Sequence, residues 1–64
     1  MDRESAVIET ARILSDSLSQ VAVTQWLGAK NLYLGGERPT DLLDAQLYDR
    51  VFQAARAFVE GTYL

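Results

Sequence analysis

The sequence predicts an all-α fold, a small bundle of three longer helices and one short helix with a projecting C-terminal tail. Apolar residues recur three and four positions apart, which is the period of a helix with one buried face. Residues that favour helix starts precede these stretches, and glycine or asparagine follows them. No repeat, low-complexity tract or linker divides the chain, so residues 1–64 are expected to form a single helical domain.

The composition argues against catalysis and against stabilising cross-links. The sequence contains no Cys and no His, so it lacks disulfides, thiolate metal ligands and the commonest general base. A chain this short buries only about 60% of its unfolded surface. Small chains without such staples often complete their core by self-association or by docking on a partner. A homodimer therefore stays open as an alternative.

Charge and hydropathy limit the classes of partner that the chain is expected to bind. The net charge is −3, from nine acidic and six basic side chains, and the basic residues are scattered along the chain. Nucleic-acid binders usually carry a basic patch or stripe, so direct DNA binding is not expected. No run of about 18 apolar residues is present to span a membrane. The polar start does not read as a signal peptide, and the expected location is cytoplasmic.

The first two helices are expected over residues 2–18 and 20–29. Asp2 and Ser19 are their N-caps, because short polar side chains accept hydrogen bonds from a helix's first amides. The apolar stripe of the first helix consists of Val7, Ala11, Leu14 and Leu18, broadened by Ile8. That stripe faces either the core or a dimer or partner seam. The face of the second helix consists of Val23, Trp26 and Leu27.

The centre of the chain reads as a helix end, a turn and a new helix. Asn31 fits the left-handed position that ends many helices, and residues 32–34 are expected to run extended into two glycines. Gly35 and Gly36 supply positive φ angles. A phosphate cradle would need a preceding strand and a Lys-Ser/Thr signature, and neither is present. Pro39 then starts a short helix over residues 40–45, with Leu42 and Leu43 turned inward.

The last helix is expected over residues 47–60 and has a broad apolar face. Gly61 stops it. The tail of Thr62, Tyr63 and Leu64 either folds back on the domain or anchors in a partner's pocket, since tyrosine is a common interface residue. The apolar face consists of Tyr48, Val51, Phe52, Ala55, Phe58 and Val59.

No set of residues supports catalysis. The serines have no His to activate them. Asp41 and Asp44 are explained better by the charge preference of a helix start than by a metal. We therefore expect a protein that is not an enzyme and that has no metal and no cofactor.

The ordered central run resembles the toxin-binding domain of Xre/MbcA/ParS antitoxins, the bacterial partners of RES-domain toxins. The resemblance covers residues 26–64, and residues 1–25 would form an N-terminal helix and a connection. It ends on Glu60-Gly61-Thr62-Tyr63. Its internal motif consists of Trp26-Leu27, Asn31, Leu34-Gly35-Gly36, Pro39 and Leu42-Leu43.

The resemblance implies a mechanism in which this chain only binds. RES toxins consume NAD or use it to modify a target, and the antitoxin places its C-terminal end at the mouth of the NAD-binding cleft. The implied toxin-binding residues are Arg56, Glu60, Gly61, Thr62, Tyr63 and Leu64. The implied scaffold residues are Trp26, Leu27, Asn31, Leu34, Gly35, Gly36, Pro39, Leu42 and Leu43.

The sequence departs from the family pattern in two ways. Members typically carry an N-terminal helix-turn-helix, and residues 1–25 are too short for a complete one. The Arg that often follows Gly-Gly is Glu37 here, with Arg38 next. Two alternatives remain: a small helical adaptor, transcription-associated or phage-encoded, that binds a different protein, or a DNA-binding fragment in which residues 18–27 mimic part of a helix-turn-helix.

Overall fold

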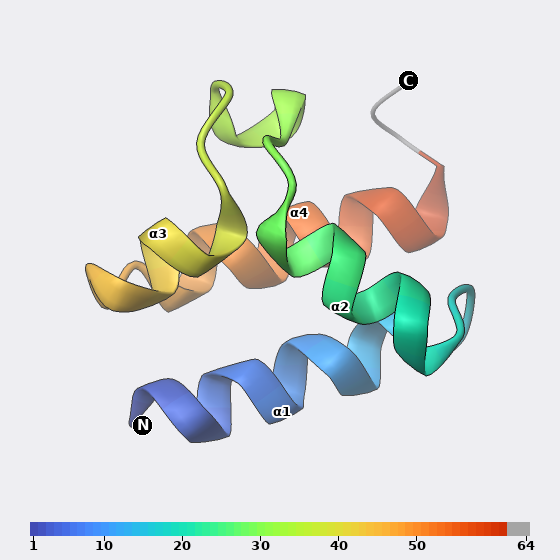
Figure 1. The fold of residues 1–64 in the computed structure, drawn as a ribbon, viewed down its shortest axis with the longest axis horizontal. Helices are drawn as coiled ribbons and strands as arrows, with labels where there is room; N and C mark the ends of the chain where they lie inside the picture. The colour runs from blue at the N-terminus through green and yellow to red at the C-terminus, as the bar shows by residue number, and fades with distance from the viewer. Residues whose placement is uncertain (62–64) are drawn as a thin grey trace.

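The computed structural model describes residues 1–61 and confirms the all-α prediction for them. Within this range no residue lies in a strand. Figure 1 shows α4 passing behind α2 and α3. The loop around η1 projects away from the helices at the top of the view, and α1 runs along the bottom. The elements are α1 (Arg3–Leu14), α2 (Gln20–Gly28), the 3₁₀ helix η1 (Leu32–Leu34), α3 (Pro39–Asp44) and α4 (Tyr48–Glu60).

The predicted helix starts are confirmed, but the first helix is shorter than expected. The Asp2 carboxylate accepts a hydrogen bond from the Ser5 amide at 2.8 Å, and the Ser19 hydroxyl accepts one from the Ala22 amide at 3.2 Å. α1 ends at Leu14, whereas the sequence predicted a helix to residue 18. The hydroxyl of Ser15 donates to the Arg12 carbonyl, a local bond that competes with the helix ladder.

The buried line of α1 differs from the predicted stripe. Ala6, Thr10 and Leu14 are fully buried, while Val7, Ala11 and Leu18 are half-buried and Ile8 is 62% exposed. The Thr10 hydroxyl tolerates burial because it donates to the Ala6 carbonyl oxygen at 2.8 Å. The first helix nevertheless packs in the core of the domain, which was one of the two alternatives for its apolar face.

Two clusters of buried side chains hold the helices together. Trp26 and Leu27 of α2 pack against both clusters and so join them. Burial of apolar surface is the main favourable term in folding, so these clusters account for most of the stabilisation. The first consists of Ala6, Leu34, Leu42, Leu43, Val51 and Ala54, and the second of Leu14, Val23 and Ala55.

α4 is the central helix, and its contact with α1 is the most extensive between any two elements of residues 1–61. Val51 and Ala55 are buried as predicted. Ala54 and Ala57 are buried too, although neither belongs to the predicted apolar face. Gly61 ends the helix with φ 72°, the left-handed conformation expected there.

The assignment of the core predicts a large loss of stability for one substitution and a small change for another, although both remove the same number of carbon atoms. Leu43→Ala should cost about 2 to 5 kcal/mol of unfolding free energy, because Leu43 is fully buried. Ile8→Ala should change it by less than about 1 kcal/mol, because Ile8 is largely exposed. Urea titration followed by circular dichroism measures both values. Equal midpoints for the two variants would contradict this core.

The N-cap of α1 predicts a pH dependence. The Ser5 amide hydrogen bond lowers the pKa of the Asp2 carboxyl below its ordinary value of 3.8. The folded state therefore favours the charged form, and the stabilisation is present above pH 3.8 and is lost as the pH falls through the lowered pKa. Asp2→Asn keeps the acceptor oxygen without the titration. Thermal melts between about pH 2 and pH 7 should show that the melting temperature of Asp2→Asn falls less in acid than that of the unmodified chain. Identical pH profiles for the two proteins would contradict the cap.

Candidate partner-binding surface

The central sequence motif forms the path from α2 through η1 into α3. Leu34, Pro39, Leu42 and Leu43 are buried, and Trp26 and Leu27 are half-buried. Pro39 stands in the first turn of α3, as predicted, where its missing amide costs no hydrogen bond. These side chains lie inside the domain, and the scaffold role that the resemblance implies for them stays a prediction.

Asn31 does not adopt the predicted left-handed conformation. Its φ and ψ are −126° and 121°, which is extended backbone. Its side-chain oxygen accepts a hydrogen bond from the Tyr33 amide at 2.9 Å and so caps η1. Residues 32–34 are therefore a 3₁₀ turn and not the expected extended segment. A side chain that satisfies an amide two residues ahead favours such a turn.

Residues 31–37 form a closed loop, which we call the 31–37 loop. The Asn31 amide donates to the Glu37 carbonyl at 3.0 Å, and the Gly36 amide donates back to the Asn31 carbonyl at 2.9 Å. Gly35 and Gly36 have φ of 68° and 89°, which confirms the positive angles predicted for them. These hydrogen bonds close the base of the loop and fix its shape.

The 31–37 loop exposes two large side chains that the sequence interpretation missed. Leu32 is 91% exposed and Tyr33 is 45% exposed, whereas Leu34 is 1% exposed. Their exposure could have been predicted from the position of Leu32 and Tyr33 between the end of one helix and a glycine pair. Apolar residues there belong to no helical stripe.

The solvent face of α4 is polar and leads to the end of the helix. Asp49, Gln53, Arg56 and Glu60 are exposed and recur at spacings of four, three and four, so they share one face. The structure thus brings together Arg56, Glu60 and Gly61 of the predicted toxin-binding residues. The other three, Thr62, Tyr63 and Leu64, lie outside the described residues.

Charges on α1 lie near this face. The Arg12 guanidinium donates to the Glu9 carboxylate at 2.6 Å. This hydrogen bond lowers the pKa of Glu9 and raises that of Arg12, and the positive charge of Arg56 adds to the lowering at Glu9. The end of α4 is therefore flanked by a mixed set of charges and not by a single-sign patch.

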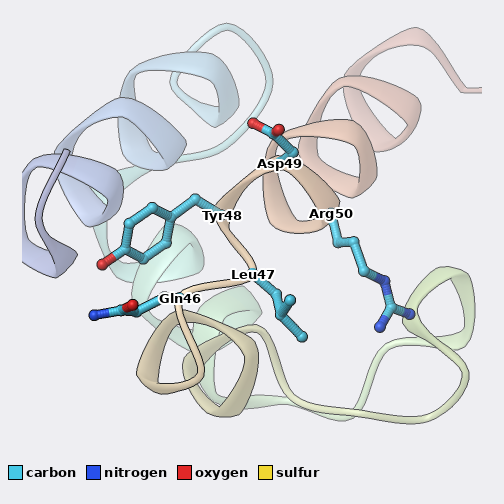
Figure 2. A pocket seen from close by; sticks show the side chains of 5 residues that line it. All are labelled: Gln46, Leu47, Tyr48, Asp49 and Arg50. Carbon is cyan, nitrogen blue, oxygen red and sulfur yellow. The ribbon is translucent and has the colours of Figure 1, made fainter.

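The surface of residues 1–61 has two hollows, each lined by both polar and apolar side chains. Figure 2 shows the first, at the junction of α3 and α4, where Gln46 and Tyr48 point to one side while Asp49 and Arg50 point in other directions. Its volume is about 240 Å³, and its residues are Gln46, Leu47, Tyr48, Asp49 and Arg50. The second, of about 320 Å³ between α1 and α2, is lined by Ile8, Ala11, Arg12, Ser15, Leu18, Gln20 and Val23.

The first hollow is explained by the way α3 ends. Gln46 has φ 63°, its amide donates to the Leu43 carbonyl, and the Leu47 amide donates to the Leu42 carbonyl. This pair of bonds is a Schellman motif, which usually places glycine at the left-handed position. The hollow is thus part of a helix-ending turn.

The described part of the chain also offers no cluster for metal chemistry. In residues 1–61 no group of three or more His, Cys, Asp or Glu side chains could hold a metal ion. No helix in this range has the length and apolar character needed to cross a membrane.

The comparisons with known proteins give one informative match. Over 63 residues, 98% of this chain, the sequence is 44% identical to a protein of Mycobacterium tuberculosis named a probable mycobacterial cidal antitoxin. The chain spans about half the length, 55%, of that relative. No family model matches the chain, and no solved structure matches it significantly. The match includes α1, so the similarity extends beyond the residue 26–64 region on which the family resemblance rests.

The 31–37 loop predicts that alanine has opposite effects at two glycines. Gly35→Ala should destabilise the fold by about 1 kcal/mol, because alanine disfavours the left-handed conformation there. Gly28→Ala, in the last turn of α2, should be neutral or stabilising by up to about 1 kcal/mol. A Cβ atom added at either position meets no atom within 4 Å, so a steric clash contributes to neither effect. Chemical denaturation of both variants measures the difference, and effects of the same sign would contradict the loop conformation.

Proposed function

We propose that this chain acts as an antitoxin, a protein that binds a toxin and neutralises it without catalysing a reaction. The observation that carries the proposal is the 44% identity over 63 residues to a protein named as an antitoxin. Binding without catalysis also fits a sequence that has no His and no Cys. The cytoplasmic location expected from the sequence belongs to the same proposal.

The finer part of the proposal concerns the toxin. The motif from Trp26 to Leu43 resembles the toxin-binding domain of Xre/MbcA/ParS antitoxins, so we take the toxin to be a RES-domain protein that consumes NAD. The antitoxin would then act by occupying the mouth of the NAD-binding cleft. In this mechanism the affinity comes from contacts at the end of α4 and in the tail, and inhibition comes from exclusion of NAD.

The fold supports this use of α4. Its inner face packs against α1, α3 and η1, so the direction of its C-terminal end is set by the core. A helix end that is fixed by the core loses little conformational freedom when it binds, which favours affinity. Arg56 and Glu60 would supply polar contacts around the cleft, and Tyr63 and Leu64 would supply apolar ones.

The direct test combines the purified chain with a RES-domain protein from its own genome, preferably one encoded beside it. NAD consumption by that protein is followed as the chain is added. We expect inhibition that is complete at about one chain per toxin if binding is tight. Light scattering of the same sample reports whether the chain binds as a monomer or as a homodimer. Undiminished NAD consumption at excess chain would exclude this mechanism.

The tail mechanism predicts the effect of a short truncation. Removing Thr62, Tyr63 and Leu64 leaves Gly61 to end α4, so the helical content should not change. Toxin affinity should fall by about tenfold to a hundredfold, because a tyrosine buried in an interface often contributes about 2 kcal/mol or more to the binding free energy. Affinity is measured by calorimetry, with neutralisation of toxin-dependent growth arrest as the second readout.

A matched pair of charge variants controls this experiment. Arg56→Gln removes a cation near the end of α4, and Arg50→Gln removes one near its start. Only Arg56→Gln should weaken the complex. Full neutralisation by the truncated chain would rule out the tail as the inhibitory element.

A further inference from the structure

We propose that the 31–37 loop is a second anchor on the toxin, with Leu32 filling an apolar pocket of that protein and Lys30 and Arg38 facing acidic groups at the rim of the pocket. The inference rests on the proposed function for the identity of the partner. It assigns a binding role to residues outside the α4 end and the tail.

Leu32 has no role in the fold that explains its identity. It is 91% exposed and belongs to neither buried cluster, while Leu34, on the same turn, is 1% exposed and lies in the first cluster. One leucine of the turn therefore holds the loop to the domain, and the other extends into solvent beside a half-exposed tyrosine. Exposed aromatic and leucine side chains on a fixed turn are suited to enter a pocket.

The loop is organised before any partner binds. Its base is closed by the bonds between Asn31 and Glu37 and between Gly36 and Asn31, and the Asn31 side chain caps the turn at the Tyr33 amide. A loop held in one shape loses little entropy when it docks. The exposed leucine is therefore presented in a defined position.

The charges around the loop define the chemistry of the pocket's rim. The chain as a whole carries a net charge of −3, yet the loop has basic residues on both sides, Lys30 and Arg38, against one exposed acidic residue, Glu37. Both basic side chains are exposed, and neither takes part in the ion pairs of Arg3 with Asp44 and of Arg12 with Glu9. Complementarity thus favours an apolar pocket with acidic groups around it.

The position of the loop lets one partner contact it and the end of α4 together. Leu34 packs in the cluster that contains Val51 and Ala54 of α4, so the loop is attached to the helix that carries the tail. In Figure 1 the loop projects at the top of the view, α4 ends at the right and α1 runs along the bottom, so a large partner that covers the upper right of the view would contact the loop and the helix end. Two anchors on one rigid body bind more tightly than either alone.

The test compares Leu32→Ala with Ile8→Ala in binding to the same RES-domain protein. Both changes remove the same number of carbons from an exposed residue, but Ile8 lies on α1, away from the loop. Leu32→Ala should raise the dissociation constant at least about tenfold, mainly through faster dissociation. Ile8→Ala should change it by less than about twofold. The melting temperature of Leu32→Ala should match that of the unmodified chain, which separates binding from folding.

A charge variant tests the rim. The double change Lys30→Gln and Arg38→Gln should slow association at low salt, and the difference from the unmodified chain should disappear at high salt. At saturating concentration, Leu32→Ala should still block NAD consumption, because the tail is intact. Equal affinity of Leu32→Ala and the unmodified chain would overturn the second anchor and leave the proposed function standing. Failure of the unmodified chain to bind the toxin would overturn both.

Discussion

The close contact between α1 and α4 is the constraint on which the rest of the domain depends. Small side chains line it, since Ala6 of α1 and Ala54 and Ala55 of α4 are fully buried. Alanine lets two helix backbones approach closely, so the larger residues Leu14 and Val51 can fill the space on either side. α2, η1 and α3 then cover this helix pair. In a chain of 64 residues, this arrangement allows two small clusters to act as one core.

The helix starts and the glycine stop of α4 could be predicted from the sequence, whereas the end of α1, the conformation of Asn31 and the rotation of each helix could not. Asp2, Ser19, Pro39 and Gly61 act where predicted, because caps depend on a few neighbouring backbone groups. The buried line of α1 is set by the helix that packs against it. Ala6 and Thr10, whose hydroxyl donates to the Ala6 carbonyl, are therefore buried there in place of the more apolar Val7 and Ile8.

The proposed binding surface also has one part that the sequence predicts and one part that it does not. The placement of Arg56, Glu60 and Gly61 at one end of α4 follows from helical spacing and a glycine stop. The exposure of Leu32 does not, because it depends on which of two acceptable conformations Asn31 adopts. A left-handed Asn31 would end α2 and let the chain run extended, but the bond to the Tyr33 amide favours the 3₁₀ turn instead. One side-chain hydrogen bond thus decides which apolar residue of the segment faces solvent.

Trp26 has a practical consequence of its own. It is the one tryptophan of the sequence, and it packs against both buried clusters. Indole emission responds to the polarity of its surroundings, so opening of either cluster would change the same optical signal. A fluorescence-monitored unfolding curve therefore reports on the cohesion of the whole domain. If it coincides with the loss of helical signal, the two clusters come apart as one cooperative unit.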